Sequence, residues 1–286
     1  MSAVALGRRF ANLVRLEHTV FALPYAYVGA ILAVDGWPGL AVLVWITVVM
    51  VGARSFAMAV NRLVDAAIDA RNPRTAGREL PAGRLGRGQV LAFAAVSLAV
   101  FAVGLSQLPA ITRWLAPIVI AAFVVYPYLK RVTPLCHLWL GIVDGLAPVG
   151  GWVAVTGHFD IAAWLLGAAV ACWIAGFDII YATMDIDVDR AQGLHSVPAD
   201  YGVARALAIS RTLHALSVVA LIGVGLSLDL GPIYAVGVAA VAVLLAYEQN
   251  LVSPGDLSRV DMAFLSVNGV IALLYFGTVT LDVALS

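Results

Sequence analysis

Long apolar runs, separated by short polar segments, follow one another along the whole chain. A membrane hydrocarbon core about 30 Å thick is crossed by a helix of about 20 mostly apolar residues. By this measure the sequence predicts nine membrane-spanning helices, and the breaks between them carry the Gly, Pro, Asp and Arg residues that are typical of turns. The predicted spans are 18–35, 40–62, 89–107, 113–129, 136–156, 161–182, 204–226, 231–249 and 262–283. We therefore expect an all-α integral membrane protein that forms a single domain over residues 1–286.

The composition agrees with insertion into a lipid bilayer. Hydrophobic residues make up 62% of the chain and charged residues only 12%, against about 25% charged residues in an average soluble protein. The formal net charge is zero, which gives no reason to expect nucleic acid or an obligate protein partner. Cys136 and Cys172 lack metal-type spacing and fit apolar packing better than a disulfide. The N-terminal segment lacks the order of a signal peptide and is interpreted as a basic, amphipathic approach to the first span.

Basic residues are distributed unevenly between the two ends of the predicted helices. Nine spans place the termini on opposite sides of the membrane, so the polar segments divide into two sets. One set contains Arg8, Arg9, Arg15, Arg71, Arg74, Arg78, Arg84, Arg87, Lys130, Arg131, Arg190, Arg205, Arg211 and Arg259, whereas the other contains only Arg113. Cytoplasmic segments carry the excess of Lys and Arg. The sequence therefore predicts a multi-pass protein of the cell inner or plasma membrane, with a cytoplasmic N-terminus and its C-terminus on the opposite side.

Two acidic stripes lie at the basic ends of the second and sixth predicted helices. Residues three, four or seven positions apart share one face of a helix. The first acidic stripe consists of Asn61, Asp65 and Asp69, and the second consists of Asp178, Tyr181, Asp185 and Asp189. Arg54 and Met58 lie on the face of the first stripe. Each stripe thus presents carboxylates in one direction at the predicted cytoplasmic end of a membrane helix.

Carboxylates gathered in this way indicate a cation site. Like charges one helical turn apart repel each other, and charged residues within membrane helices are costly and usually functional. Oxygen ligands favour a hard cation such as Mg²⁺ or Ca²⁺, and Mg²⁺ commonly shares its ligands with substrate phosphate groups. Two facing stripes are suited to hold two Mg²⁺ ions with a diphosphate between them. The alternative is that the acids are helix-end charges in headgroup water, which explains a single Asp better than two matched stripes.

Three ordered motifs resemble those of the UbiA superfamily of intramembrane aromatic prenyltransferases. The stretch "NRLVDAAIDARNPRTAGRELPAGRL" (61–85) is similar to the first aspartate-rich motif of that superfamily, and "DIIYATMDIDVDRAQGLHSVPADYG" (178–202) is similar to the second. "YPYLKR" (126–131) resembles its Y-x-x-x-K element, and "RLEHTVFALPYA" (15–26) its opening helix. The resemblance implies nine helices around a central cavity, with a cytoplasmic cap over the active site.

The resemblance assigns roles to individual residues. It implies that Mg²⁺, two ions in all, is bound by Asn61, Asp65, Asp69, Asp185 and Asp189. It implies catalytic roles for Asp178, Lys130 and Arg78, and substrate binding by Arg15, Arg74, Tyr126 and Tyr181. Arg54 is a physical candidate for binding an acceptor carboxylate, or else it neutralises Asp65 or another buried acid. The chain departs from the pattern at Arg62, where many members have an acid, and at His18, where several have lysine.

Three roles have two interpretations each. Asp178 either takes a proton from a phenolic acceptor or orients it, or else supports the metal ligands from behind. His195 is either part of a lid over the cavity or a polar loop residue. The aromatic residues Tyr126, Tyr128, Trp139, Trp173, Phe177 and Tyr181 either shelter a carbocation by cation–π contact or pack within the membrane.

The resemblance implies transfer of a polyprenyl group from polyprenyl diphosphate to a small aromatic acid in menaquinone or ubiquinone biosynthesis. The acceptor is 4-hydroxybenzoate or 1,4-dihydroxy-6-naphthoate, and "GLHSVP" (193–198) favours the latter. Another acceptor is an open alternative. A cation transporter is the alternative from a different class, because membrane-embedded Asp and Arg also line ion paths. A CDP-alcohol phosphatidyltransferase is disfavoured, since its compact D-G-x-x-A-R motif is absent.

Overall fold

The chain folds almost entirely into helices, and the computed structural model describes residues 3–14 and 16–286, with 3–5, 16–22, 264 and 265 described by their backbone alone. Arg15 and the side chain of His18 therefore lie outside the described residues. The α-helices are α1 (Ala3–Val14), α2 (Leu16–Ala33), α3 (Leu40–Asp69), α4 (Arg87–Ser106), α5 (Ala110–Leu129), α6 (Cys136–Thr156), α7 (Ile161–Ala182), α8 (Ile186–Gln192), α9 (Val197–Tyr201), α10 (Val203–Ser227), α11 (Pro232–Asn250) and α12 (Asn268–Leu285). A 3-10 turn (Thr183–Asp185) precedes α8, and a π-helical segment (Met262–Val267) precedes α12.

The all-α membrane fold predicted from the sequence is confirmed. Within the described residues, eight helical segments are long and apolar enough to cross a membrane. They are Leu40–Asp69, Arg87–Ser106, Ala110–Leu129, Cys136–Thr156, Ile161–Gln192, Val203–Ser227, Pro232–Asn250 and Asn268–Leu285. The first predicted span corresponds to α2, of which the part Leu23–Ala33 is apolar but shorter than a membrane crossing. The eight other predicted spans each coincide with a helix.

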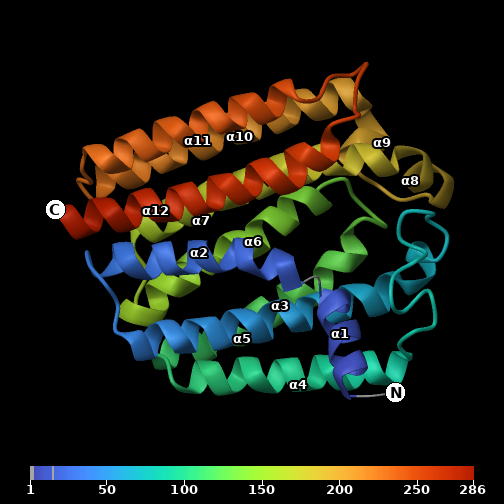
Figure 1. The fold of residues 1–286 in the computed structure, drawn as a ribbon, viewed down its shortest axis with the longest axis horizontal. Helices are drawn as coiled ribbons and strands as arrows, with labels where there is room; N and C mark the ends of the chain where they lie inside the picture. The colour runs from blue at the N-terminus through green and yellow to red at the C-terminus, as the bar shows by residue number, and fades with distance from the viewer. Residues whose placement is uncertain (1–2, 15) are drawn as a thin grey trace.

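The long helices lie side by side along the long axis of the molecule (Figure 1). Helix α6 is central, since it packs against both α2 and α7. Small residues allow this close approach. A Cβ atom added at Gly151 of α6 would collide with the carbonyl oxygen of Ala26 in α2, and one added at Gly145 would lie 2.5 Å from the carbonyl oxygen of Gly167 in α7. Glycine at these positions therefore sets the spacing of the three helices.

The two largest hydrophobic clusters among the described residues lie in different groups of helices. The larger core joins α2, α6, α7 and α10–α12 and includes the buried aromatic residues Tyr25, Trp173 and Tyr275. A smaller core joins α1, α3 and α4 with Leu80 and Leu85 of the segment that follows α3. Helices from both groups line the cavity described below. Burial of these side chains fixes the two groups of helices, and the cavity lies where they face each other.

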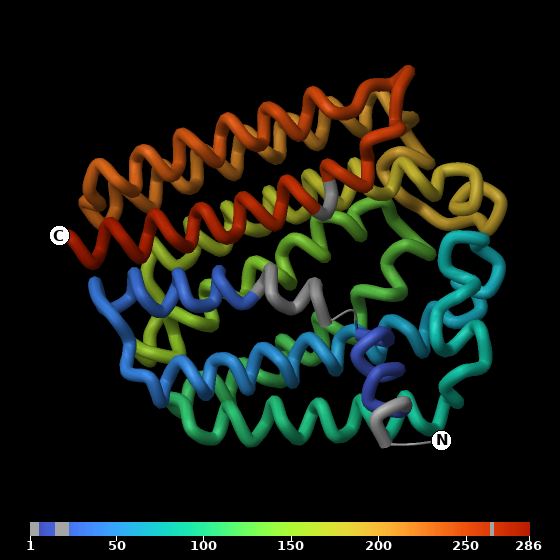
Figure 2. Tube along the Cα trace, in the orientation of Figure 1, coloured from blue at the N-terminus to red at the C-terminus, as the bar shows by residue number. Residues whose placement is uncertain are grey.

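Two cap segments lie at the same end of the helices (Figure 1). The first cap segment, residues 70–86, follows α3, and the second, residues 183–202, follows α7 and contains α8 and α9. Helix α1 runs across the bundle near this end, whereas the C-terminus lies at the opposite end (Figure 2). Helix α1 and the end of α12 thus lie toward opposite ends of the bundle.

The N-terminus of α11 is capped by a side chain from another helix. Asp282 of α12 is 4% exposed and accepts hydrogen bonds from the backbone N–H groups of Gly231 at 2.8 Å and Tyr234 at 3.0 Å. The first N–H groups of a helix have no partner within the helix itself. Asp282 therefore satisfies two of these donors and fastens α11 to α12.

Replacement of Asp282 with alanine should lower the free energy of unfolding by about 1–2 kcal/mol, because the capping acceptor is lost. Asp282→Asn keeps one accepting oxygen and should fall between the alanine variant and the wild type. Thermal denaturation of the protein in detergent, followed by size-exclusion chromatography, measures this order. An alanine variant that denatures together with the wild type would contradict the capping role.

Candidate active site

Both acidic stripes open onto one cavity of about 680 Å³. Every site residue predicted from the sequence, except the undescribed Arg15, lines this cavity. These residues are Arg54, Asn61, Asp65, Asp69, Arg74, Arg78, Tyr126, Lys130, Asp178, Tyr181, Asp185 and Asp189. Apolar side chains, among them Met50, Phe123 and Ile174, line its remaining surface. The cavity thus has a charged end below the cap segments and a long apolar part within the helices.

The first acidic stripe ends helix α3, and its carboxylates are already paired with cations. Asp65 is 2% exposed and contacts Lys130 Nζ at 2.5 Å and Arg131 Nη2 at 3.1 Å. Asn61 also donates to Asp65 at 3.3 Å. Since α3 and α5 pack against each other, the "YPYLKR" element at the C-terminal end of α5 brings its cations to the stripe. Arg131 was missed in the sequence analysis, although its position next to Lys130 was a visible signal.

Asp69 lies one turn further along α3 and connects the stripe to the first cap segment. Its Oδ1 accepts a hydrogen bond from Arg78 at 2.7 Å, and Arg62 lies 3.9 Å from its Oδ2. Thr75 donates to the backbone oxygen of Asp69 at 2.9 Å. Oδ2 of Asp69 is buried without a hydrogen-bond partner among the described residues. One oxygen of this carboxylate therefore accepts no hydrogen bond from the described residues. At position 62, where the family pattern has an acid, this chain places a cation near Asp69.

The second acidic stripe pairs with the first cap segment across the cavity. Arg74 forms a two-pronged ion pair with Asp185, with Nε 3.1 Å from Oδ1, and Asn72 donates to the same oxygen at 2.9 Å. Arg74 also donates to the hydroxyl of Tyr181 at 2.6 Å and lies 5.0 Å above its ring centroid. Partial burial acts to lower the pKa of Arg74, but the hydrogen bond and charge of Asp185 raise it above its ordinary value. Asp189 accepts from Ser196 at 2.9 Å.

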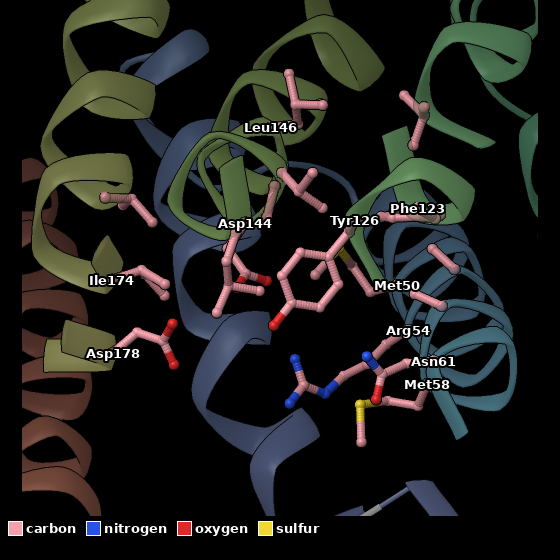
Figure 3. A pocket seen from close by; sticks show the side chains of 18 of the residues that line it. Met50, Arg54, Met58, Asn61, Phe123, Tyr126, Asp144, Leu146, Ile174 and Asp178 are labelled. Atoms are coloured by element: carbon pink, nitrogen blue, oxygen red, sulfur yellow. The ribbon is translucent and has the colours of Figure 1, made fainter. Parts of the chain in front are cut away.

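Four polar groups meet in the part of the cavity nearest its apolar section (Figure 3). The guanidinium of Arg54, the hydroxyl of Tyr126 and the carboxylates of Asp144 and Asp178 all point into the same space. Nε of Arg54 is buried without a hydrogen-bond partner among the described residues. The nearby negative charge that acts on Arg54 is that of Asp144, whereas Asp65 is paired with Lys130 and Arg131. The alternative role of Arg54, neutralising a buried acid, therefore applies to Asp144 and not to Asp65.

Asp144 was missed in the sequence analysis. The signal was present, because Asp144 is the only acidic residue in the apolar run of α6, residues 136–156. His195, considered as a lid residue, lies in the second cap segment and contacts Asp200 at 3.0 Å. Among the aromatic candidates, Tyr126, Trp173, Phe177 and Tyr181 line the cavity. Tyr128 and Trp139 are not among the lining residues; Tyr128 is 51% exposed, and Trp139 donates to the carbonyl oxygen of Ala122 at 3.1 Å.

The donor groups at the charged end fit a hard divalent cation. They are carboxylate and amide oxygens, which Mg²⁺ prefers, and one buried oxygen of Asp69 has no hydrogen-bond donor among the described residues. Among these residues, no three His, Cys, Asp or Glu side chains gather closely enough to hold a metal ion by themselves. Mg²⁺ usually takes one or two carboxylates and completes its shell with water and phosphate oxygens. The arrangement is consistent with a metal that is bound together with a phosphate-bearing substrate.

The first cap segment is organised around one buried carboxylate. Glu79 is 7% exposed and accepts hydrogen bonds from Arg84 at 2.7 Å and from Asn12 of α1 at 3.4 Å. The hydrogen bond from Arg84 lowers the pKa of Glu79 below its ordinary value, although burial opposes the change. Arg9 of α1 donates to the carbonyl oxygen of Arg84 at 2.5 Å. Helix α1 and Glu79 together hold the segment that positions Arg74 and Arg78.

Known proteins resemble this chain over nearly its whole length. The sequence model of the UbiA prenyltransferase family matches residues 22–274. A 4-hydroxybenzoate octaprenyltransferase of Marinobacter nauticus is 31% identical over 279 residues, which cover 96% of this chain and 94% of that protein. The apo structure of a UbiA homologue from Aeropyrum pernix has a TM-score of 0.85 at 37% identity, covering 93% of this chain and 98% of that one.

A further structural likeness shows the fold alone. A UbiA homologue from Archaeoglobus fulgidus, bound to GPP and Mg²⁺, has a TM-score of 0.75 at 18% identity and covers 96% of this chain and 99% of that one. The helical arrangement is thus kept at low sequence identity.

Removal of the Glu79 carboxylate should loosen the first cap segment. Glu79→Ala leaves Arg84 and Asn12 without their acceptor, at a cost of about 1–2 kcal/mol, and that cost should make local opening roughly 5- to 30-fold more frequent. Limited tryptic digestion in detergent, with cleavage sites mapped by mass spectrometry, should show faster cleavage within residues 71–87. Asp187→Ala removes an exposed carboxylate from α8 and serves as the control. Equal cleavage rates in both variants would contradict this role.

Proposed function

The chain belongs to the UbiA prenyltransferase family, and we propose that it transfers a polyprenyl group from a polyprenyl diphosphate to a ring carbon of an aromatic carboxylic acid. The convergence of both acidic stripes with Lys130 and Arg74 at the charged end of a largely apolar cavity is the observation that carries this proposal. The charged end suits the diphosphate and the apolar part suits the chain. Family membership decides against the transporter interpretation, because the relatives are named as transferases.

Three cations at the charged end are the expected partners of the diphosphate. Lys130, Arg74 and Arg78 each form an ion pair with a carboxylate of a stripe. Guanidinium groups also form paired hydrogen bonds with phosphate oxygens, and an ammonium group binds them as a point charge. We infer that an incoming diphosphate takes over these cations and leaves the carboxylates to the metal. Each of these three cations is then paired with an anion before and after the exchange, which avoids the cost of a buried unpaired charge.

Mg²⁺ is the proposed cofactor, with two ions bound. Asn61, Asp65 and Asp69 would hold one, and Asp185 and Asp189 the other. When bound, Mg²⁺ would neutralise the negative charge that develops on the departing diphosphate. The Archaeoglobus fulgidus homologue bound to GPP and Mg²⁺ supports this combination of ligands.

In the proposed reaction, the bond between the first carbon of the prenyl chain and the diphosphate oxygen breaks, and the oxygen keeps the electron pair. The acceptor ring supplies the electron pair for the new carbon–carbon bond, and the ring carbon then loses its hydrogen as a proton. Lys130, Arg74 and Arg78 hold the leaving group. Asp178 accepts the proton or the hydrogen bond of the acceptor's hydroxyl group, which makes the ring more electron-rich. The rings of Tyr126 and Tyr181 lie where they can stabilise the transient positive charge.

Arg54 is the proposed partner of the acceptor's carboxylate. It lies beside Tyr126 and Asp178 in the cavity, and its Nε has no hydrogen-bond partner among the described residues (Figure 3). An acceptor with a carboxylate and a hydroxyl at opposite ends would contact Arg54 with one end and Asp178 with the other. The names of the relatives favour 4-hydroxybenzoate. Asp144 offers a further acceptor for a second hydroxyl, which makes 1,4-dihydroxy-6-naphthoate the second candidate.

The uneven charge of the polar segments supports a cytoplasmic placement of both cap segments. In that orientation the N-terminus lies in the cytoplasm and the C-terminus lies across the inner or plasma membrane. Water-soluble acceptor and Mg²⁺ reach the charged end from the cytoplasm, whereas the prenyl chain stays in contact with lipid.

Loss of either stripe should abolish Mg²⁺-dependent transfer. Asp65→Ala and Asp185→Ala each remove a carboxylate that the metal and the diphosphate require, and we expect turnover to fall at least about 100-fold. Transfer of a labelled prenyl group to 4-hydroxybenzoate, with increasing Mg²⁺, measures the loss. Asp187→Ala lies outside the stripes and should keep its turnover. Unchanged turnover in either stripe variant, with folding checked by size-exclusion chromatography, would exclude the two-metal proposal.

Arg54→Leu should discriminate between acceptors. Loss of a charged hydrogen-bond partner costs about 1.5–3 kcal/mol, which corresponds to a roughly 10- to 100-fold higher KM for acceptors that carry a carboxylate. The KM for the prenyl diphosphate should stay unchanged. Steady-state kinetics with 4-hydroxybenzoate, 1,4-dihydroxy-6-naphthoate and matched phenols without a carboxylate test this. An equal loss with both kinds of acceptor would argue against carboxylate binding, and no product with any aromatic compound in the wild type would overturn the proposed function.

A further inference from the structure

We propose that His137 is a positioning residue, which holds the carboxylate of Asp178 toward the acceptor and makes its orientation depend on the docking of the second cap segment. This inference rests on the proposed function, in which Asp178 contacts the acceptor's hydroxyl group. His137 itself does not line the cavity. Neither the sequence motifs nor the relatives' names assign it a role.

His137 lies directly behind Asp178. It occupies the first turn of α6, is 5% exposed, and places Nδ1 2.7 Å from Oδ2 of Asp178 in α7. Asp178 lines the cavity, and its carboxylate points into the space shared with Arg54 and Tyr126 (Figure 3). One oxygen of Asp178 is therefore held from behind by His137, and the carboxylate as a whole faces the acceptor position.

The backbone of the second cap segment determines which nitrogen of His137 carries the proton. The N–H of Val197 lies 3.2 Å from Nε2 of His137, and a backbone N–H is always a donor. Nε2 must therefore be the acceptor, and the proton of the neutral ring lies on Nδ1, which donates to Asp178. If both ring nitrogens carried a proton, the Nε2–H of His137 would point at the N–H of Val197. His137 thus acts as a fixed donor to Asp178.

Three consecutive residues of the second cap segment each contact a different part of the site. The N–H of His195 donates to the carbonyl oxygen of Lys130 at 2.7 Å, and Ser196 donates to Asp189 at 2.9 Å. The N–H of Val197 reaches Asp178 through His137. The segment therefore connects a candidate diphosphate cation, a candidate metal ligand and the acceptor-facing carboxylate. Docking of these three residues fixes all three groups together.

The chemical consequence concerns the proton of the acceptor's hydroxyl group. A carboxylate can accept that proton efficiently only when one of its oxygens is directed at the hydroxyl, and small misplacements are costly in rate. Without His137, Asp178 is free to turn within the cavity toward Arg54 or Tyr126. Loss of His137 should therefore lower kcat most strongly for acceptors that hold their hydroxyl proton tightly.

The test compares variants of His137 in the full-length protein, with 4-hydroxybenzoate and ring-fluorinated 4-hydroxybenzoates as acceptors. His137→Leu should lower kcat by about 10- to 100-fold with 4-hydroxybenzoate, and the loss should shrink as fluorination makes the hydroxyl more acidic. The KM for the prenyl diphosphate should not change. His137→Gln supplies one amide N–H for Asp178 and one carbonyl oxygen for Val197, so it should recover most of the lost rate.

The control is His214→Leu, which removes another buried histidine outside the cavity. The ratio of its kcat with the fluorinated acceptors to its kcat with 4-hydroxybenzoate should equal that of the wild type. If His137→Leu does not fold, His137→Asn takes its place, because its shorter amide cannot span both partners. A loss of equal size with every acceptor, no loss at all, or no recovery by His137→Gln would overturn the positioning role. A wild type that transfers to no aromatic acceptor would overturn the proposed function instead.

Discussion

The structure depends on one constraint: a charge placed at the end of a membrane helix must have a partner of opposite sign. An unpaired buried charge costs several kcal/mol, so cations beside Asp65, Asp69 and Asp185 stabilise the acidic stripes. Lys130 and Arg131 supply these cations to Asp65, Arg78 supplies one to Asp69, and Arg74 supplies one to Asp185. These ion pairs connect α3 to α5 and to the first cap segment, and the first cap segment to the second. The same contacts that relieve the charge thus also hold together the elements around the charged end of the cavity.

Much of the fold could be predicted from the sequence because a local run of apolar residues is enough to predict a membrane helix. The length of each apolar run determines a span, and eight predicted spans coincide with helices. The two stripes were also predictable, since residues such as Asp65 and Asp69 share a helix face by spacing alone. That both stripes line one cavity could be predicted only from the resemblance to a known family, because periodicity does not show which helices face each other.

The partners across helices could not be predicted, because they depend on how distant segments pack. Asn72 donates to Asp185 over 113 positions of sequence, and no local pattern connects the two. Asp144 stood out as an isolated acid in α6, but its proximity to Arg54 depends on how α6 packs against α3, which no local pattern shows. His137 gave no signal at all, since a histidine at the start of an apolar helix is ordinary. Sequence thus indicated the charged groups themselves, and packing determined what each of them contacts.

The second cap segment shows why a site of this kind is built partly from backbone. Of its three contacts, those of His195 and Val197 use main-chain N–H groups, which any residue except proline would supply. Only Ser196 contributes through its side chain, and the same hydroxyl also caps α9 by accepting from the N–H of Ala199 at 3.3 Å. The cap of α9 therefore sets where the neighbouring N–H groups point. A short helix held in this way can fix Lys130, His137 and Asp189 at once, although none of its residues is among those that line the cavity.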